Sequence, residues 1–461
     1  MRPVWIEGGW VQATGHSSRT IQNPATLEPI EVVPECGASE VSRALRAARE
    51  ALPRWRALGA AARAEKLREA ADAVSAAADE LAILSTRETG APLLDSLDAV
   101  AVVAALLRKS ADRAGDHSAR PAPRDTPPSA APRVVLAGPR YPLIDLAARI
   151  APALGRGETI VCRPTPTAPL ASLALAQCLA ALPAGVIGMI TGGDATAAAL
   201  IEHPDTGALA APSALAAHRR PEVLIVPRDA DLELAAAGIA AHRFFDAGQR
   251  AGLCPTVYVE QPLVSAFVER LHSYLAFLEI GDPIKPVTDL GPLASATASA
   301  ALETQVAHAL KQGGKLVLGA RRFQPWGLMG YFFQPTLFTR GRLEARDLEE
   351  QISGPVLAIC AVQDLAEALA GLLGARGAHL TILGGELERV LAALAREAPG
   401  RLRRVAQSAA GCGVHPLLER VAAGIQEEAQ SPFVAGEPLC IDIEHVTTRA
   451  PWWFPYAERR R

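Results

Sequence analysis

A repeated alternation of short apolar strands with helices is the feature that most limits what this chain can fold into. Val134–Leu136, Thr159–Cys162 and Val186–Ile190 are apolar runs of strand length, and 143–154 and 168–182 lie between them as helices. Strands joined through helices run parallel and are covered on both faces. The sequence therefore predicts a doubly wound α/β sheet.

The same alternation continues through most of the remaining chain. A strand at 222–226 and a helix at 232–244 lead to a second block that begins near Thr256. The second block is predicted to contain strands at 256–259, 315–318, 333–338 and 355–362, helices at 262–277 and 295–312, and further helix over 384–428. Ahead of both blocks, 39–107 has helical apolar spacing, and 117–132 is a Pro-rich loop or linker.

Composition excludes several classes of protein. The chain has 461 residues, 49% of them hydrophobic, and a net charge of −3, so it buries enough apolar surface to fold. A near-neutral balance argues against a nucleic-acid or anionic-membrane partner. No apolar run has the length of a membrane span or a signal peptide, so we expect a cytoplasmic protein.

Cysteine and histidine usage indicates no metal centre. Seven cysteines form no Cys-x-x-Cys pair, and ten histidines show no metal-ligand spacing. The thiols are typical of reduced, mostly buried residues. Gly-x-Gly-x-x-Gly, P-loop and Gly-x-Ser-x-Gly motifs are also missing.

Short motifs along the whole chain resemble those of the aldehyde dehydrogenase superfamily, in the family's order and spacing. They include the opening Trp5–Val11 and Asn23–Thr26, then Glu88–Leu93, Ala151–Leu154, Gly157–Val161, Phe244–Gln249, Gly281–Pro283, Thr288–Leu293, Gly330–Phe338 and Glu349–Val356. The resemblance implies an aldehyde dehydrogenase-like fold with two doubly wound domains. It assigns 1–116 with 133–228 to a cofactor-type domain, 229–428 to a catalytic-type domain, and 117–132 with 429–461 to a reduced oligomerisation region.

The nucleophile position is the first departure from the family's pattern. A cysteine that lies two residues after the Gln of "AGQ" attacks the aldehyde in the family. Ala251 occupies that position here, and Cys254 follows three residues later. Cys254 is either a displaced nucleophile or a buried structural thiol. If the chain is active, His218 or a water molecule is the candidate base.

Two further catalytic groups of the family are missing. No Glu lies between His203 and Pro221, where the family places its general base. The segment that carries the family's oxyanion Asn is Gly138–Pro142 here, with Arg140 and Tyr141 in place of the aromatic and Asn residues.

The cofactor residues are substituted as well. The ribose-binding Lys is replaced by Arg163, the Glu three residues later by Pro166, and a second ribose-binding Glu by Gln351. The loop and helix that contact the pyrophosphate are shortened between Leu209 and Pro221. These changes predict that no cofactor is bound, whereas NAD or NADP binds if the chain is an active dehydrogenase.

Together these losses favour a non-catalytic homologue that binds a partner. The alternative is an NAD(P)-dependent aldehyde oxidoreductase that uses Cys254, and a weaker one is an enzyme that handles thioesters or esters. The predicted partner is a homologous dehydrogenase, in a homo- or hetero-oligomer. Proline in 117–132 cannot donate ladder hydrogen bonds between subunits, whereas the strand Cys440–Val446 is a candidate interface.

Overall fold

The computed structural model describes residues 1–15, 17–115, 130–138, 141–210, 222–249, 256–340, 353–364 and 366–368, and three strands at 378–383, 402–407 and 441–446. The described residues up to Ala210 form one compact unit, and those from 222 onward belong to a second. In these ranges no helix combines the length and apolarity that a membrane crossing requires.

The first unit is built on a six-stranded sheet with the order β2-β1-β7-β6-β5-β8. Its strands are β1 (Val4–Ile6), β2 (Gly9–Val11), β5 (Arg133–Leu136), β6 (Ile160–Arg163), β7 (Ile187–Met189) and β8 (Ala208–Ala210). Strands β7, β6, β5 and β8 are parallel, and β1 adds antiparallel to β7. Because β5 pairs with both β6 and β8, the winding reverses at β5, and the predicted doubly wound sheet is confirmed.

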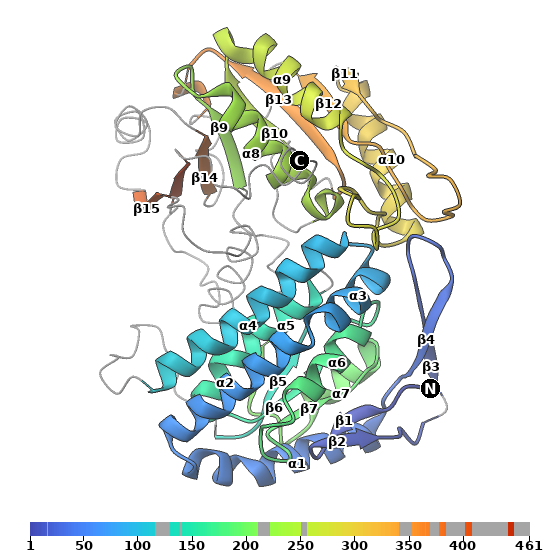
Figure 1. Ribbon diagram of the computed structural model, residues 1–461, viewed down its shortest axis with the longest axis vertical. Coiled ribbons are helices and arrows are strands. Elements are labelled where there is room, and N and C mark those ends of the chain that lie inside the picture. Colours follow the sequence, from blue (N-terminus) through green and yellow to red (C-terminus); the bar gives the residue numbers. More distant parts are fainter. Residues whose placement is uncertain are drawn as a thin grey trace. The chain divides into compact units, whose positions relative to one another are not determined.

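Seven described helices cover this sheet (Figure 1). They are α1 (Ala38–Ala57), α2 (Ala60–Ala76), α3 (Ala78–Thr89), α4 (Leu93–Gly115), α5 (Pro142–Gly155), α6 (Leu170–Cys178) and α7 (Asp194–Glu202). Helices α5 and α6 contact the sheet, and α2, α3 and α4 pack against them. Helix α1 packs on β6, β7 and α7, with Val41, Leu45 and Ala48 buried against Val134 and Val161.

A buried carboxylate joins two helices of this unit. The side chain of Glu88 in α3 accepts hydrogen bonds from the amides of Leu170 (2.6 Å) and Ala171 (2.8 Å) at the start of α6. These amides have no partner within the helix, so Glu88 satisfies two of its free donors. Burial raises the pKa of Glu88 to about 8, against the lowering effect of the two amides.

The hairpin of β3 (Ser18–Gln22) and β4 (Pro29–Pro34) forms a separate two-stranded sheet in the same unit. Only Ile21 of β3 is buried, whereas the end of β4 enters the core through Val33. The hairpin therefore delivers the residues that follow β4 to the edge of the larger sheet.

The second unit contains an eight-stranded sheet with the order β11-β12-β13-β10-β9-β14-β16-β15. Its strands are β9 (Glu222–Val226), β10 (Thr256–Glu260), β11 (Lys315–Leu318), β12 (Thr336–Arg340), β13 (Val356–Val362), β14 (Ala378–Leu383), β15 (Leu402–Gln407) and β16 (Ile441–Val446). All neighbours pair in parallel except β11 and β12.

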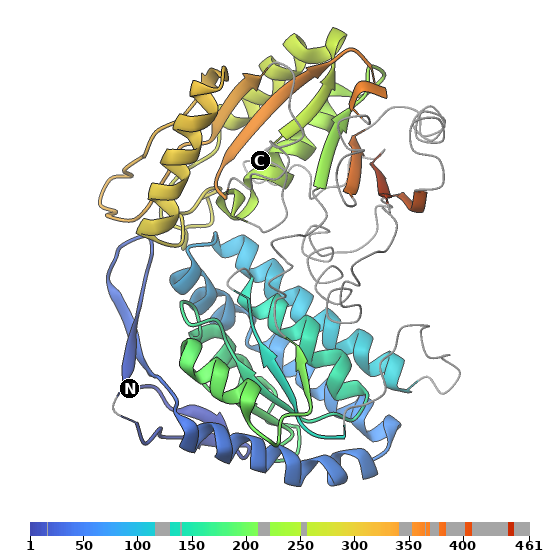
Figure 2. The ribbon, with the colours of Figure 1, turned by 180° about the vertical axis from the view of Figure 1, so that it is seen from behind.

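The described α-helices of this unit pack on its sheet, which the view from behind also shows (Figure 2). They are α8 (Leu232–Phe244), α9 (Val264–Ala276) and α10 (Ala296–Lys311), with the short 3₁₀ turns η2 (Phe245–Gly248) and η3 (Gln261–Leu263). Phe244, Phe267 and Leu302 of these helices bury against Phe338 and Leu357 of the sheet. Burial of such large apolar side chains stabilises a fold by about 1.5–3 kcal/mol each.

Three predictions about the organisation of the chain are corrected. Strand β9 was expected in the first domain, within 133–228, but pairs with β10 and β14 of the second sheet. Strand β15 lies within the predicted helix at 384–428, because its pairing with β16 overrides helix propensity. The strand proposed as an interface, β16, is paired on both sides, so its backbone offers no free edge. Most of 117–132 and 429–461 lies outside the described residues.

Candidate functional site

The turn that follows α8 has a strained backbone. Asp246, Ala247 and Gly248 have φ values of 51°, 49° and 64°, three consecutive residues in the left-handed region. Residues other than glycine seldom adopt this region, and each costs about 1–3 kcal/mol unless its surroundings impose it. Gln249 comes next and is the last described residue before 250–255, which contain Ala251 and Cys254.

A buried arginine donates hydrogen bonds to the backbone of this turn. Arg243, in the last turn of α8, is fully buried, and its Nη1 donates to the carbonyl oxygen of Gly248 at 3.0 Å. Its Nε donates to the carbonyl oxygen of Val356 in β13 at 2.7 Å. One side chain thus ties the turn to the central part of the sheet.

Gln249 fixes the end of the turn with its amide side chain. Its Oε1 accepts from the amide of Ala294 at 2.9 Å, and its Nε2 donates to the carbonyl oxygens of Asp246 (3.3 Å) and Pro292 (3.4 Å). Only 2% of Gln249 is exposed, and the two bonds that its Nε2 donates form away from water. A buried amide with both ends bonded holds a backbone in one arrangement.

Gly248 allows the turn to lie directly against the segment before β13. The Gly354 amide donates to the Gly248 carbonyl oxygen at 3.0 Å. A Cβ atom at Gly248 would lie 2.1 Å from the carbonyl oxygen of Gly354. No side chain fits at this distance, so the glycine is required by close backbone approach as well as by its positive φ. Arg243, Gly248 and Gln249 therefore preorganise the backbone that enters 250–255.

In the first unit, Arg163 ends strand β6 at the carboxyl edge of the parallel sheet, where ligands of doubly wound sheets bind. It is 8% exposed. Its Nη1 reaches only the carbonyl oxygen of Pro164, at 3.5 Å, and its Nε has no hydrogen-bond partner among the described residues. Burial lowers the pKa of Arg163, Asp194 and Glu35 act to raise it, and Arg19 lowers it further.

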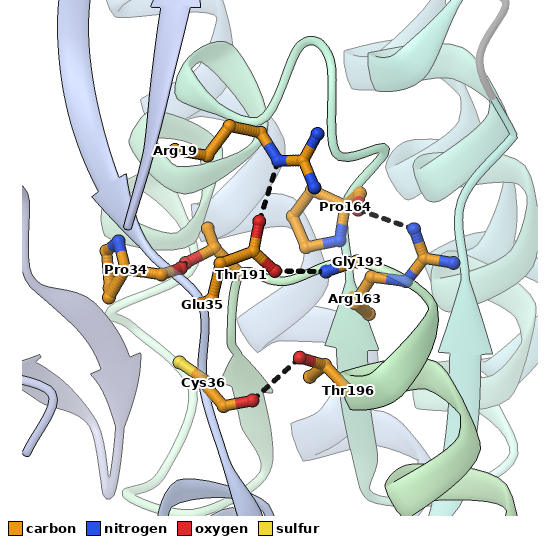
Figure 3. Close-up of polar contacts among 9 residues, drawn as sticks. All are labelled: Arg19, Pro34, Glu35, Cys36, Arg163, Pro164, Thr191, Gly193 and Thr196. Atoms are coloured by element: carbon orange, nitrogen blue, oxygen red, sulfur yellow. Dashed lines mark hydrogen bonds and ion pairs between the residues drawn. The ribbon is translucent and has the colours of Figure 1, made fainter. Parts of the chain in front are cut away.

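Glu35 links this edge to the hairpin (Figure 3). Its Oε1 accepts from Nε of Arg19 at 2.7 Å, and its Oε2 accepts from the amide of Gly193 at 2.6 Å. Gly193 is the N-cap residue directly before α7, so Glu35 supplies negative charge at a helix N-terminus, where it is favoured. The loop between β7 and α7 is thereby held beside the end of β4.

Two hydroxyl groups fasten the same loop. Thr191 Oγ1 donates to the carbonyl oxygen of Pro34, and Thr196 Oγ1 donates to that of Cys36, both at 2.6 Å. A Cβ atom at Gly192 would lie 1.9 Å from Thr196 Oγ1, so this position excludes any side chain. The loop beside Arg163 is therefore rigid and lies close to the hairpin (Figure 3).

The described residues cover only part of the site predicted from the sequence. Arg163 is placed at the carboxyl edge of the first sheet, whereas Ala251, Cys254, His218, Arg140 and Gln351 lie outside the described residues. Sequence analysis did not single out Glu35, Arg19 or Arg243. No local pattern marks them, because their roles depend on contacts between segments far apart in the chain.

Comparisons with known proteins agree with this geometry. The sequence model of the "Aldehyde dehydrogenase family" matches residues 10–211 and 222–372. The chain is 31% identical to glutarate-semialdehyde dehydrogenase of Pseudomonas aeruginosa over 398 residues, which cover 80% of this chain and 81% of that protein.

Two solved structures show the same fold. Lactaldehyde dehydrogenase from Escherichia coli superposes with a TM-score of 0.77 at 27% identity, covering 85% of this chain and 88% of the other. PnpE in complex with nicotinamide adenine dinucleotide has a TM-score of 0.77 at 26% identity, covering 87% and 88%.

These comparisons correct the expectation of a non-catalytic homologue. That expectation was drawn from the combined loss of the nucleophile at Ala251, the general base, the oxyanion Asn and much of the cofactor loop. It is wrong, because relatives matched over four fifths of this chain are named as dehydrogenases of aldehydes and semialdehydes. The approach to the nucleophile segment also keeps a fully bonded and preorganised turn at Arg243, Gly248 and Gln249.

Proposed function

Because this chain belongs to the aldehyde dehydrogenase family, we propose that it is an NAD(P)-dependent aldehyde oxidoreductase that oxidises an aldehyde to the acid with Cys254 as nucleophile. The observation that carries the proposal is the turn at 246–249, whose left-handed residues are held by Arg243, Gln249 and Gly354. Strained residues of this kind cluster at active sites, where the surrounding structure imposes their conformation.

The proposed reaction forms and breaks bonds at Cys254. Its thiolate adds to the carbonyl carbon and gives a hemithioacetal. The nicotinamide cofactor supplies a hydride acceptor, so that oxidation of this carbon leaves a thioester. Water then attacks the thioester, which releases the carboxylic acid and returns the thiol. His218 or a second water molecule is the proposed base for the last step.

The described residues fit a nicotinamide cofactor at the edge of the first sheet. Among the described residues the buried Nε–H of Arg163 has no hydrogen-bond partner, and the loop from Thr191 to Gly193 is fixed beside it. A buried donor without a partner is costly, and an oxygen-rich ligand would satisfy it. Arg163 is therefore proposed to contact the adenosine half of the cofactor.

The test is direct. The purified protein is incubated with NAD⁺ or NADP⁺ and a panel of aldehydes, beginning with the semialdehydes of glutarate and succinate that name its relatives. Formation of the reduced cofactor, followed by its ultraviolet absorbance, supports the proposal. Cys254→Ser should abolish turnover, whereas Cys178→Ser, in helix α6 of the first unit, should retain it. Absence of turnover on the whole panel, or full activity of Cys254→Ser, contradicts it.

An oligomer, of this chain alone or with a homologous dehydrogenase, stays a proposal. Light scattering on the purified chain tests the first form. Co-expression with an intact homologue, followed by affinity capture, tests the second. A monomer over the whole concentration range and no captured homologue would contradict both.

A further inference from the structure

A buried ion pair lies in the first two turns of α5, the helix that follows strand β5. Nη2 of Arg149 donates to Oδ1 of Asp145 at 3.0 Å, and Nε of Arg149 lies 3.3 and 3.2 Å from the two carboxylate oxygens. Only 1% of the Arg149 side chain and 6% of the Asp145 side chain are exposed. Removing two charges from water is costly, and an apolar pair of similar volume is often at least as stable. Stability alone therefore does not account for this pair.

The carboxylate of the pair also closes the segment between β5 and α5. Oδ2 of Asp145 accepts a buried hydrogen bond of 2.8 Å from the amide of Gly138. The amide of Asp145 donates to the carbonyl oxygen of Tyr141 at 2.9 Å. Both described ends of the segment 138–141 are therefore bonded to Asp145, and Arg149 holds the carboxylate in one orientation.

The backbone of this segment is strained where it enters the helix. Tyr141 has φ 48° and ψ 59°, in the left-handed region that residues other than glycine seldom adopt. Residues of this kind cluster at active sites. Strand β5 is where the winding of the first sheet reverses, and doubly wound sheets bind ligands beyond the carboxyl ends of their strands at this point. The pair thus fixes a strained segment at the edge where a ligand is expected.

We infer that Asp145 and Arg149 are positioning residues of the proposed reaction: they hold the segment 138–141 so that its donors meet the aldehyde oxygen. This inference rests on the proposed function. When the thiolate adds to the carbonyl carbon, a carbon–sulfur bond forms and the π electrons of the carbonyl move to its oxygen. Donors that are already in place stabilise this negative charge most effectively.

Two double variants separate positioning from folding. Asp145→Asn with Arg149→Met removes both charges but keeps an oxygen that accepts from the Gly138 amide. Asp145→Leu with Arg149→Met removes the same charges and the acceptor as well. We expect the first double variant to keep kcat within about threefold of wild type, and the second to lower kcat about 10- to 100-fold. KM should change by less than about threefold in both, because the lost interaction belongs to the transition state.

Hydrogen–deuterium exchange reports on the segment without turnover. Peptides that cover 137–142 should exchange as slowly in the Asn–Met variant as in wild type, and about tenfold faster or more in the Leu–Met variant. Urea unfolding verifies that each variant is folded. If the Leu–Met variant does not fold, Arg149→Lys replaces it, because lysine keeps the charge but not the planar fork. Arg149→Lys should then show the same two changes at smaller size, and wild-type exchange and kcat in that variant would overturn the inference.

The matched control is a second buried ion pair on the same strand. Nε of Arg133 lies 2.5 Å from Oε2 of Glu158, with 10% and 0% of the two side chains exposed. Arg133 begins β5, so this pair lies at the opposite end of the strand from Gly138. Arg133→Met with Glu158→Gln should change the unfolding midpoint but leave kcat and the exchange of 137–142 at wild-type values.

The outcomes separate this inference from the proposed function. An active wild type together with full kcat in the Leu–Met variant overturns the positioning role and leaves the proposed function standing, whether or not exchange becomes faster. An equal loss of kcat in both double variants also overturns it, because the acceptor then plays no part. A wild type that oxidises no aldehyde contradicts the proposed function. Fast exchange confined to the Leu–Met variant supports, even in that case, the hold of Asp145 on the segment.

Discussion

The Oε1 atom of Gln249 accepts a hydrogen bond of 2.9 Å from the backbone amide of Ala294, 45 residues further along the chain. This contact joins the end of the strained turn to the loop that precedes α10. It fixes the position of the backbone at Gln249, directly before 250–255. The backbone that leads to the proposed nucleophile segment is therefore held by residues that do not themselves react.

Gln249→Ala should destabilise the second unit and slow catalysis. The substitution removes the side-chain partner of the buried Pro292 carbonyl and of the Ala294 amide, which costs about 1–3 kcal/mol. Urea unfolding measures the loss, and steady-state kinetics should show a lower kcat. The exposed Gln261→Ala in the same unit is the control and should change neither. Wild-type stability and kcat in Gln249→Ala would contradict this role.

Gly248→Ala and Gly327→Ala separate close approach from backbone strain. Both glycines have positive φ, 64° and 76°, but a Cβ at Gly248 meets the Gly354 carbonyl at 2.1 Å whereas one at Gly327 meets nothing within 4 Å. We expect Gly327→Ala to cost about 1 kcal/mol. Gly248→Ala should cost about 3 kcal/mol or more and abolish turnover. Equal unfolding midpoints for the two variants would show that the close approach is relieved without cost.

Glu88 should make the stability of the first unit fall as pH rises. Burial raises its pKa from 4.5 to about 8, so the native state holds the proton more firmly than the unfolded chain does. The resulting stabilisation is complete below about pH 4.5 and is lost as pH rises through about 8.

Urea titrations between these values measure the effect. Glu88→Gln should remove a slope of up to about 1.4 kcal/mol per pH unit. Glu69→Gln, which alters the exposed pair with Lys66, should keep the wild-type slope. An unchanged slope in Glu88→Gln would show that Glu88 stays ionised in the native state.

Alkylation should distinguish the cysteines of the folded protein. Burial raises the pKa of Cys36 to about 12 and raises that of Cys162 above its ordinary value, so neither forms the reactive thiolate near neutral pH. Mass spectrometry after brief treatment with iodoacetamide should find Cys36 and Cys162 unmodified. Cys254 should be modified first if it is the nucleophile. Protection of Cys254 together with labelling of Cys162 would contradict its assignment.

Local pattern predicted most elements of the fold. The strand Lys315–Leu318 and the helix Leu232–Phe244 have the predicted bounds, because apolar period and length suffice to identify them. The sheet to which a strand belongs depends instead on pairing across long separations, and this is why β9 was assigned to the first domain. Leu402–Gln407 has helix-favouring neighbours in sequence, yet its partner Ile441–Val446 makes it a strand.

Only the parts of the candidate site that lie within a sequence motif could be predicted. Arg163 and the Phe244–Gln249 segment were identified by position in the chain. Glu35 gave no local signal, because its partner Gly193 lies 158 residues away. The assignment of Ala251 to the nucleophile position stays a prediction, whereas the inference that activity is lost is contradicted by the named relatives.

The strand order of the second sheet determines when each strand can meet its partner during synthesis on the ribosome. Strand β15 pairs only with β16 in the described sheet, and β16 lies between β14 and β15 although it is made last of the three. When residues 402–407 leave the ribosome, their pairing partner β16 has not yet been translated. The edge of β14 stays open during that interval, and an unpaired edge is where a nascent strand meets wrong partners. In the first sheet, β8 is translated last and adds directly to β5, which has already been translated.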